Sequence, residues 1–221
     1  MLTLAVTAQA QVGEYRRDLA IGVNGGYCLN KVSFDPTIQQ AFHGGMTGGV
    51  TLRYTCEKYF AIYCALQAEV NYAQLGWKET LDGTKENYNR TVNYFQVPLL
   101  ARLGFGREVH GVMGYLVLGP QLGFYTSDHS KQTSNWSTVS PGYNTAQYGD
   151  IEKSFEYGLT GGLGIEVNTR HAGHFMVEGR YYFGLSDMFG NGKKDAFGRS
   201  ANGTIVAKVS YLFDVIKTRR K

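Results

Sequence analysis

The fold is decided by stretches such as His174-Phe-Met-Val-Glu-Gly-Arg-Tyr-Tyr-Phe-Gly-Leu-Ser186, in which apolar and polar side chains alternate. Successive side chains of a β-strand point to opposite faces, so this alternation predicts a strand with one apolar and one polar face. The same pattern recurs along the chain, and we expect eight strands. They lie at about residues 19–29, 46–56, 59–76, 92–105, 112–125, 154–168, 174–186 and 203–215.

The two faces of the predicted strands differ sharply in charge. One face carries no charged residue in any strand, whereas the other combines many glycines with a balanced set of acids and bases. These charged residues are Arg53, Glu69, Arg102, Glu156, Glu166, Glu178, Arg180, Lys208 and Asp214. Small residues beside large ones suit the cramped lumen of a narrow barrel, and a basic residue facing lipid at mid-depth costs about 2–4 kcal/mol. The pattern therefore predicts a barrel whose apolar face meets lipid and whose polar face points inward.

The connections between the predicted strands alternate in length. Those at 57–58, 106–111 and 169–173 are short, and those at 30–45, 77–91, 126–153 and 187–202 are long. Short periplasmic turns and long extracellular loops are typical of outer-membrane barrels. We therefore predict an all-β, eight-stranded antiparallel up-and-down transmembrane β-barrel with a filled polar lumen, in the outer membrane of a Gram-negative bacterium. Its expected partners are outer-membrane lipid and lipopolysaccharide, with envelope proteins as further partners.

Composition excludes several other classes of protein. The chain has 221 residues, which suits one domain, and its 43% hydrophobic content with a net charge of +4 excludes a disordered chain. No apolar run reaches the roughly 18 residues of a membrane helix, and no internal basic block points to nucleic acid. Ala8-Gln9-Ala10 follows a short apolar stretch and matches a signal-cleavage site. We interpret residues 1–10 as a residual signal peptide and residues 11–221 as a single outer-membrane β-barrel domain.

The lumen-facing charges are the first candidate site. Carboxylates close together can perform acid–base chemistry, but buried charges must be paired, and the preferred interpretation is a structural ion-pair network. Its predicted members are Arg53, Glu69, Arg102, Glu166, Glu178, Arg180 and Lys208. No catalytic or metal-binding motif is present, so we predict no catalytic residue, no metal and no cofactor. His171 and His174 have an H-x-x-H spacing but fall in a short predicted connection, where solvated turn histidines are expected.

Aromatic residues in the long loops are the second candidate site. Phe34, Ile38 and Phe42 recur every four residues, which is typical of one face of a short helix that either caps the barrel or offers apolar anchors to a partner. Capping is the favoured interpretation. Trp136, Tyr143 and Tyr148 lie in a long polar loop and are equally consistent with recognition or with a solvated loop.

The cysteines carry no motif. A turn at Glu57-Lys58 would place Cys56 opposite Tyr59 and Cys64 opposite Thr51, out of register for a disulfide. With Cys28 they are interpreted as small apolar fillers.

Several segments, in their order and spacing, give the chain a family resemblance. They are Leu66-Gln-Ala-Glu-Val-Asn-Tyr72, Tyr94-Phe-Gln-Val-Pro-Leu-Leu-Ala-Arg102, Leu118-Gly-Pro-Gln-Leu-Gly123, Gly162-Leu-Gly-Ile-Glu166, Val177-Glu-Gly-Arg-Tyr-Tyr-Phe-Gly-Leu185 and Val209-Ser-Tyr-Leu-Phe213. Through them the chain resembles the PorT-like outer-membrane β-barrel family of Bacteroidetes, which is similar in architecture to OmpX. The resemblance implies an outer-membrane barrel of about eight strands and fixes no biochemical activity.

Four functions are compatible with this sequence. The leading hypothesis is a non-enzymatic barrel that acts as a structural or interaction protein through its extracellular loops. The second is an accessory subunit of an envelope secretion or assembly complex. A membrane-embedded barrel enzyme would need catalytic groups at the loop rim, where Asp128, His129 and Asp150 form no recognised arrangement. A soluble lipocalin-like ligand binder would need the opposite polarity, with its apolar face inward.

Overall fold

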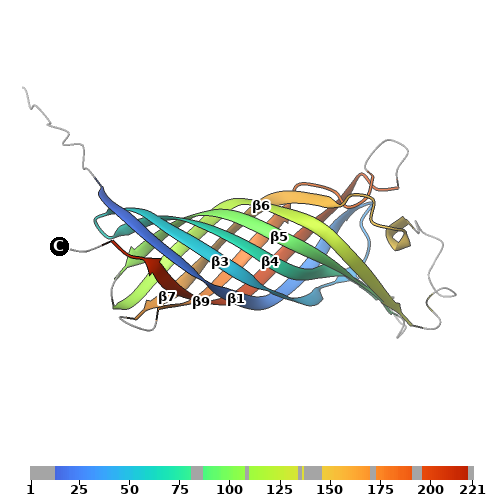
Figure 1. The fold of residues 1–221 in the computed structure, drawn as a ribbon. Helices are drawn as coiled ribbons and strands as arrows, with labels where there is room; N and C mark the ends of the chain where they lie inside the picture. The colour runs from blue at the N-terminus through green and yellow to red at the C-terminus, as the bar shows by residue number, and fades with distance from the viewer. Residues whose placement is uncertain are drawn as a thin grey trace, which may run out of the picture.

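The computed structural model describes residues 13–80, 87–107, 110–133, 136, 146–169, 173–190 and 196–218. Over these residues eight long antiparallel strands and a two-residue strand, β2, form one sheet that closes into a barrel through the pairing of β4 with β5. The elements are β1 (Glu14–Asp35), β2 (Gln40–Ala41), β3 (His43–Tyr59), β4 (Ile62–Thr80), β5 (Asn87–Gly106), β6 (Gly111–Gln132), β7 (Phe155–Asn168), β8 (His174–Gly184) and β9 (Arg199–Ile216), with a short 3₁₀ turn at Ala146–Tyr148. β1 begins and β9 ends at the same end of the barrel (Figure 1). No helix in this part of the chain is long and apolar enough to cross a bilayer.

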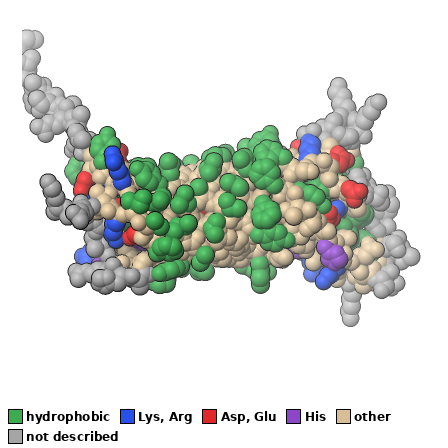
Figure 2. All heavy atoms as spheres, in the orientation of Figure 1, with side chains coloured by type: hydrophobic (Ala, Val, Ile, Leu, Met, Phe, Trp, Pro, Cys, Tyr) green, Lys and Arg blue, Asp and Glu red, His purple; other side chains and the backbone are tan. Residues whose placement is uncertain are grey.

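The barrel has the predicted inside-out polarity. Val23, Leu118 and Leu163 are 60%, 64% and 66% exposed on the outer wall, whereas Arg102 and Glu166 are 3% and 2% exposed inside. Figure 2 shows apolar side chains around the middle of the molecule, with charged side chains gathered at its two ends. This arrangement excludes the soluble-barrel alternative, because water would meet a continuous apolar wall.

The apolar side chains around the middle of the outer wall are called the apolar belt below. The polarity of the two faces reverses where the strands extend beyond this belt. In β1 the outward residues Lys31 and Ser33 are exposed, while the inward residues Val32 and Phe34 are only 1% and 6% exposed. Several segments that were predicted as loop belong to strands. They are 30–35, 43–45, 77–80, 87–91, 126–132 and 199–202. The prediction missed them because it followed apolar residues on the outer face. Beyond the membrane the outer face meets water and the apolar residues turn inward.

The hairpin between β3 and β4 corrects a predicted register. Its turn is at Phe60-Ala61 rather than at Glu57-Lys58, with Tyr59 paired to Ile62. A bulge after Thr55 brings Cys64 opposite Glu57, not opposite Thr51, so Cys56 lies nearer to Cys64 than predicted. All three cysteines are free thiols in the described chain, and Cys28 is buried.

An apolar cluster fills the extracellular end of the lumen, above the polar layers. Its buried members are Cys28, Val32, Phe34, Ala73, Leu75, Trp77, Tyr88, Val92, Tyr94, Trp136, Met188, Phe189 and Phe197. Ile38 packs against the cluster, but Phe34 belongs to β1 and Phe42 is 54% exposed on the other side of β2. The helix predicted for these residues is therefore wrong, because Phe34 reaches the lumen through strand alternation rather than through a helical face.

If the apolar outer wall faces lipid, a charge placed on it should destabilise the barrel, and this can be tested. Replacing Leu163, in the apolar belt on β7, with Arg should lower the free energy of unfolding in lipid vesicles by about 2–4 kcal/mol. The control is Val112→Arg, which adds the same charge at the periplasmic start of β6 and should cost about 0–1 kcal/mol. Urea titration of the vesicle-inserted protein measures both. Equal costs at the two positions would contradict the membrane placement.

Candidate functional site

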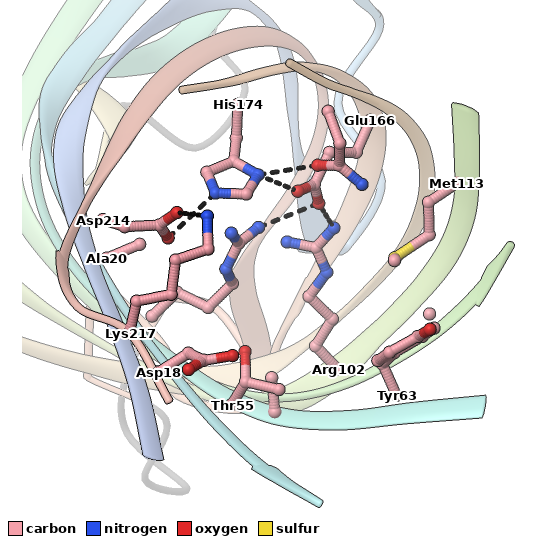
Figure 3. A pocket seen from close by; sticks show the side chains of 14 residues that line it. Asp18, Ala20, Thr55, Tyr63, Arg102, Met113, Glu166, His174, Asp214 and Lys217 are labelled. Carbon is pink, nitrogen blue, oxygen red and sulfur yellow. Dashed lines mark hydrogen bonds and ion pairs between the residues drawn. The ribbon is translucent and has the colours of Figure 1, made fainter. Parts of the chain in front are cut away.

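The periplasmic half of the lumen contains an ion-pair layer centred on Glu166. Arg53 Nη1 donates to Glu166 Oε2 at 2.8 Å, and the Arg102 guanidinium binds the same carboxylate. His174 lies between two acids, with Nδ1 2.8 Å from Glu166 and Nε2 2.9 Å from Asp214 (Figure 3). Because β3, β5, β7, β8 and β9 each contribute one of these side chains, the layer ties most of the barrel wall together.

A second layer, nearer the middle of the barrel, is centred on Glu69. Arg180 donates to both of its carboxylate oxygens, at 2.7 and 3.0 Å, and the Lys208 ammonium binds Oε2. Arg180 also pairs with Glu178 at 2.6 Å. Gln67 and Asn71 donate amide hydrogens to the two oxygens of Glu69 at 2.7 and 2.9 Å. A bidentate Arg pair with further donors is the geometry in which a buried carboxylate is best compensated.

Tyr115 connects the two layers. Its hydroxyl donates to Glu178 at 3.0 Å, and the Arg102 guanidinium lies over its ring, 3.7 Å from the centroid. The pocket left at the periplasmic mouth holds only about 50 Å³. That is room for a few water molecules rather than for a substrate. The two ion-pair layers are thus self-paired, with little free space beside them.

All seven lumen residues named from the sequence lie on the inner wall and take part in these two layers. The layers also contain Asp214, which was placed on the polar face but not in the network, and His174, which sequence reasoning missed. It was assigned to a solvated turn, but it is the first residue of β8 and points into the lumen, where Asn168 lies 2.6 Å from its Nδ1. The sequence did carry a signal for this placement. In β8 the even-numbered residues Met176, Glu178 and Arg180 point into the lumen, and His174 continues the same alternation. His171 lies outside the described residues.

The aromatic loop residues are mostly not at the surface. Trp136 is 4% exposed and stacks on Tyr88, with ring centroids 5.9 Å apart, and Tyr148 packs edge-on against Tyr88 at 4.7 Å. Tyr148 also donates to Glu79 at 3.0 Å. Side chains held in this way cannot serve as ready anchors for a partner, which corrects the recognition hypothesis for Trp136 and Tyr148 and, with its 6% exposure, for Phe34. Phe42 is exposed, Ile38 is half-buried, and Tyr143 lies outside the described residues.

Above the membrane, β4, β5 and β6 continue as a sheet, and the two residues of β2 pair with the outer side of β4. β5 pairs with β4 out to Asn87↔Thr80 and with β6 out to Tyr88↔Gln132. The pairing of β6 with β7, by contrast, begins only at Phe124↔Phe155. Within the described chain, residues 126–132 therefore form an edge strand with no neighbour on one side.

The sheet extension is held rigidly on its inner face. Arg90 Nε donates to Asp128 at 2.7 Å, and Nη1 donates to the carbonyls of Gln147 and Gly149 at 3.0 and 2.6 Å. Tyr125 donates to the other oxygen of Asp128 at 2.6 Å. Asp128 is thus held by donors from two neighbouring side chains.

The hydrogen bonds at the two ends of this edge fix which backbone groups are free. The Tyr125 amide donates to Ser154 on the β7 side, and the Thr133 amide donates to Asn87 on the β5 side. Backbone groups of alternate residues in an antiparallel strand point to opposite sides. Counting back from Thr133, the amides and carbonyls of Asp128, Ser130 and Gln132 face the open edge.

Within the described chain no group of three or more His, Cys, Asp or Glu residues could hold a metal ion. The described chain offers two features. One is the pair of self-paired layers below the apolar cluster of the lumen. The other is the edge of β6 outside the membrane, which has no described neighbour.

Comparison with known proteins gives one family. The family model for the outer membrane protein beta-barrel domain matches residues 8–190. No curated protein matches. Among solved structures, the Pseudomonas aeruginosa outer membrane protein OprG is 16% identical, with 91% of this chain and 98% of that chain covered and a TM-score of 0.44. The attachment invasion locus protein Ail of Yersinia pestis is also 16% identical, with 90% and 99% covered and a TM-score of 0.38. Neisserial surface protein A is 14% identical, with 88% of this chain and 97% of that chain covered and a TM-score of 0.42.

Proposed function

Because the chain belongs to the outer membrane beta-barrel domain family, we propose that it is a non-enzymatic interaction protein of the outer membrane. The barrel would serve as a sealed support, and binding would take place on the extracellular extension of β4, β5 and β6. Its partner would be an extended peptide segment of another surface or envelope protein. The observation that carries this proposal is that residues 126–132 of β6 have, within the described chain, no strand on the side away from β5.

The open edge suits peptide addition in several respects. A strand that presents unpaired amide and carbonyl groups is a template for a further strand, and main-chain hydrogen bonds then supply the affinity. Arg90 and its contacts hold the extension in place before binding, so little conformational entropy is lost when a peptide binds to it. The exposed residues Ser127 and His129 would choose among partner side chains.

The lumen supports the non-enzymatic part of the proposal. Glu69 and Glu166, the carboxylates best placed for chemistry, are each paired with cations of the wall, and the pocket beside Glu166 holds about 50 Å³, which is room only for water. We propose a structural role for the seven lumen charges and no ion conduction through the barrel.

The finer assignments rest on the sequence segments that carry the resemblance. They support a PorT-like member of the family from Bacteroidetes. Ala8-Gln9-Ala10 separately supports the proposal that residues 1–10 are the end of a signal peptide. A role as an accessory subunit of an envelope secretion or assembly complex is the second proposal, and the open edge would be the contact through which such a subunit docks.

The proposal is tested by removing one edge amide. Ser130→Pro deletes an N–H that faces away from β5, so the barrel should fold normally while strand addition is blocked. A photo-cross-linker placed at Gln132 in intact cells should form protein adducts in the wild-type background, and these should be lost with Ser130→Pro.

The matched control is Lys131→Ala, which changes an outward side chain and leaves every backbone group in place. It should keep most of the adducts. Equal adduct yields from Ser130→Pro and Lys131→Ala, or no adduct in any background, would refute recognition through the strand edge.

A further inference from the structure

A groove of about 440 Å³ lies on the outer wall at the extracellular margin of the apolar belt. It is lined by residues of β1, β8 and β9 and by residues of the connection between β1 and β3 (residues 36–42, which include β2 and are called the hairpin below), among them Lys31, Phe42, Tyr181, Gly203 and Ile205. Gly203 pairs with Lys31 on β1 and with Phe183 on β8, so its missing side chain leaves a depression between larger neighbours. A Cβ atom at this position would lie 3.2 Å from the Tyr181 hydroxyl, which leans over the depression.

The lower part of the groove is continuous with the lipid-facing wall. Tyr181 and Ile205 are cross-strand partners, 50% and 46% exposed, and Ile205 also pairs with Leu29 of the belt. Phe42, 54% exposed, provides an apolar wall on the hairpin side. A hydrocarbon chain can therefore enter the groove from the bilayer without crossing a polar surface.

The upper part of the groove carries a positive charge. Lys31 is exposed and forms no ion pair with any carboxylate of the described chain. It lies at the first outward position beyond Leu29, where the outer face changes from apolar to polar. An ammonium at this height faces the level of the lipid head groups, where a phosphate is its natural partner.

The hairpin above the groove is fixed rather than free to close over it. The Gln40 side chain accepts from the Val32 amide at 3.2 Å and donates to the Val32 carbonyl at 2.7 Å. This pair of bonds ties the turn after β1 to the wall that carries Lys31, so the groove is preformed.

We propose that this groove binds one molecule of lipopolysaccharide, with an acyl chain against Tyr181, Ile205 and Phe42 and a lipid phosphate at Lys31. The groove belongs to the extracellular half of the barrel, which faces the outer leaflet, and lipopolysaccharide is the lipid of that leaflet that combines acyl chains with phosphate. The site is on the outer wall, away from the edge of β6. A failure of the peptide-binding proposal would therefore not affect this one.

Two variants separate the two halves of the groove. Gly203→Leu fills the depression, and each CH₂ group that it keeps out of the groove forfeits a factor of about four in affinity. Lys31→Gln removes the charge and keeps the length of the side chain. The matched controls are Gly114→Leu, a lipid-facing position with no atom within 4 Å of an added Cβ, and Lys131→Gln on the extension of β6.

The full chain, purified in detergent, is titrated with lipopolysaccharide, and bound lipid is counted by native mass spectrometry. We expect one lipid per barrel for the wild type and both controls. Affinity should fall about ten-fold or more for Gly203→Leu and about five-fold for Lys31→Gln. Circular dichroism confirms that each variant is folded, and Lys31→Gln, being a surface change, keeps the test open if Gly203→Leu does not fold.

Three results would overturn the proposal. These are unchanged binding in both groove variants, equal loss in the controls, and equal retention of phosphatidylglycerol by the same groove residues. The last would assign the groove to phospholipid. Loss of peptide adducts at Gln132 with normal lipid binding would instead concern only the strand edge.

Discussion

Replacing Glu69 with Gln is expected to lower the free energy of unfolding by about 3–5 kcal/mol, the cost of stranding a buried charge. Glu69 is 2% exposed, and it is the only carboxylate within ion-pair distance of Lys208 in the described chain. Arg180 keeps Glu178 as a partner at 2.6 Å after the change. The loss therefore falls mainly on Lys208, whose ammonium would remain inside the barrel without a counter-charge.

A second substitution should reverse much of this loss. Lys208→Met in the Glu69→Gln background removes the stranded ammonium and replaces it with an apolar chain of similar length. Replacing both members of a buried ion pair with well-packed neutral groups is often close to neutral. The double variant is thus expected to be more stable than Glu69→Gln alone, which a sum of two independent losses would not give.

Urea unfolding in phospholipid vesicles, followed by tryptophan fluorescence, measures these differences. Glu14→Gln serves as the control, because the Glu14 side chain is 61% exposed in its contact with Arg16 and should change stability by well under 1 kcal/mol. If Glu69→Gln lowers the free energy of unfolding no more than Glu14→Gln does, the lumen charges do not depend on one another for stability and water reaches them freely.

The membrane-spanning part of the fold was predictable because lipid imposes one rule on every strand. Outward positions from Leu19 to Leu29 of β1 carry no charge, and the same holds for the membrane-spanning part of the other seven long strands. Inward charges such as Glu69 and Arg180 then had to be paired, since a narrow lumen offers little water. Alternation plus charge balance was therefore enough to name the members of the network, although not which pairs form.

Outside the membrane the same rule misled the prediction. Lys31-Val32-Ser33-Phe34 alternates as strictly as the belt does, and so does the shorter Asn87-Tyr88-Asn89, but their apolar or aromatic members point inward. A search for apolar outward faces therefore ended each strand too early. The position of the β3–β4 turn was also beyond reach, because a bulge after Thr55 adds a residue that alternation alone does not reveal.

Replacing Trp77 with Ala is expected to lower the free energy of unfolding by about 3–5 kcal/mol, because it leaves a cavity in the apolar cluster. Trp77 is fully buried, packs edge-on against Phe34 with ring centroids 5.5 Å apart, and donates from Nε1 to Glu79 at 2.9 Å. Truncation therefore removes packing and also leaves Glu79 with one donor fewer. Because Trp77 is one of two tryptophans, unfolding is followed by circular dichroism rather than by fluorescence.

The control for Trp77→Ala is Phe95→Ala, which removes an aromatic ring from the lipid face of β5. Phe95 is 47% exposed and its ring lies 5.6 Å from that of Tyr72, so the expected loss is only about 0.5–1.5 kcal/mol. Planar-bilayer recordings should show no channel for either variant, because the layers around Glu69 and Glu166 still fill the lumen below the cavity. A stable conductance in Trp77→Ala alone would mean that the apolar cluster, and not the ion-pair layers, is what seals the barrel.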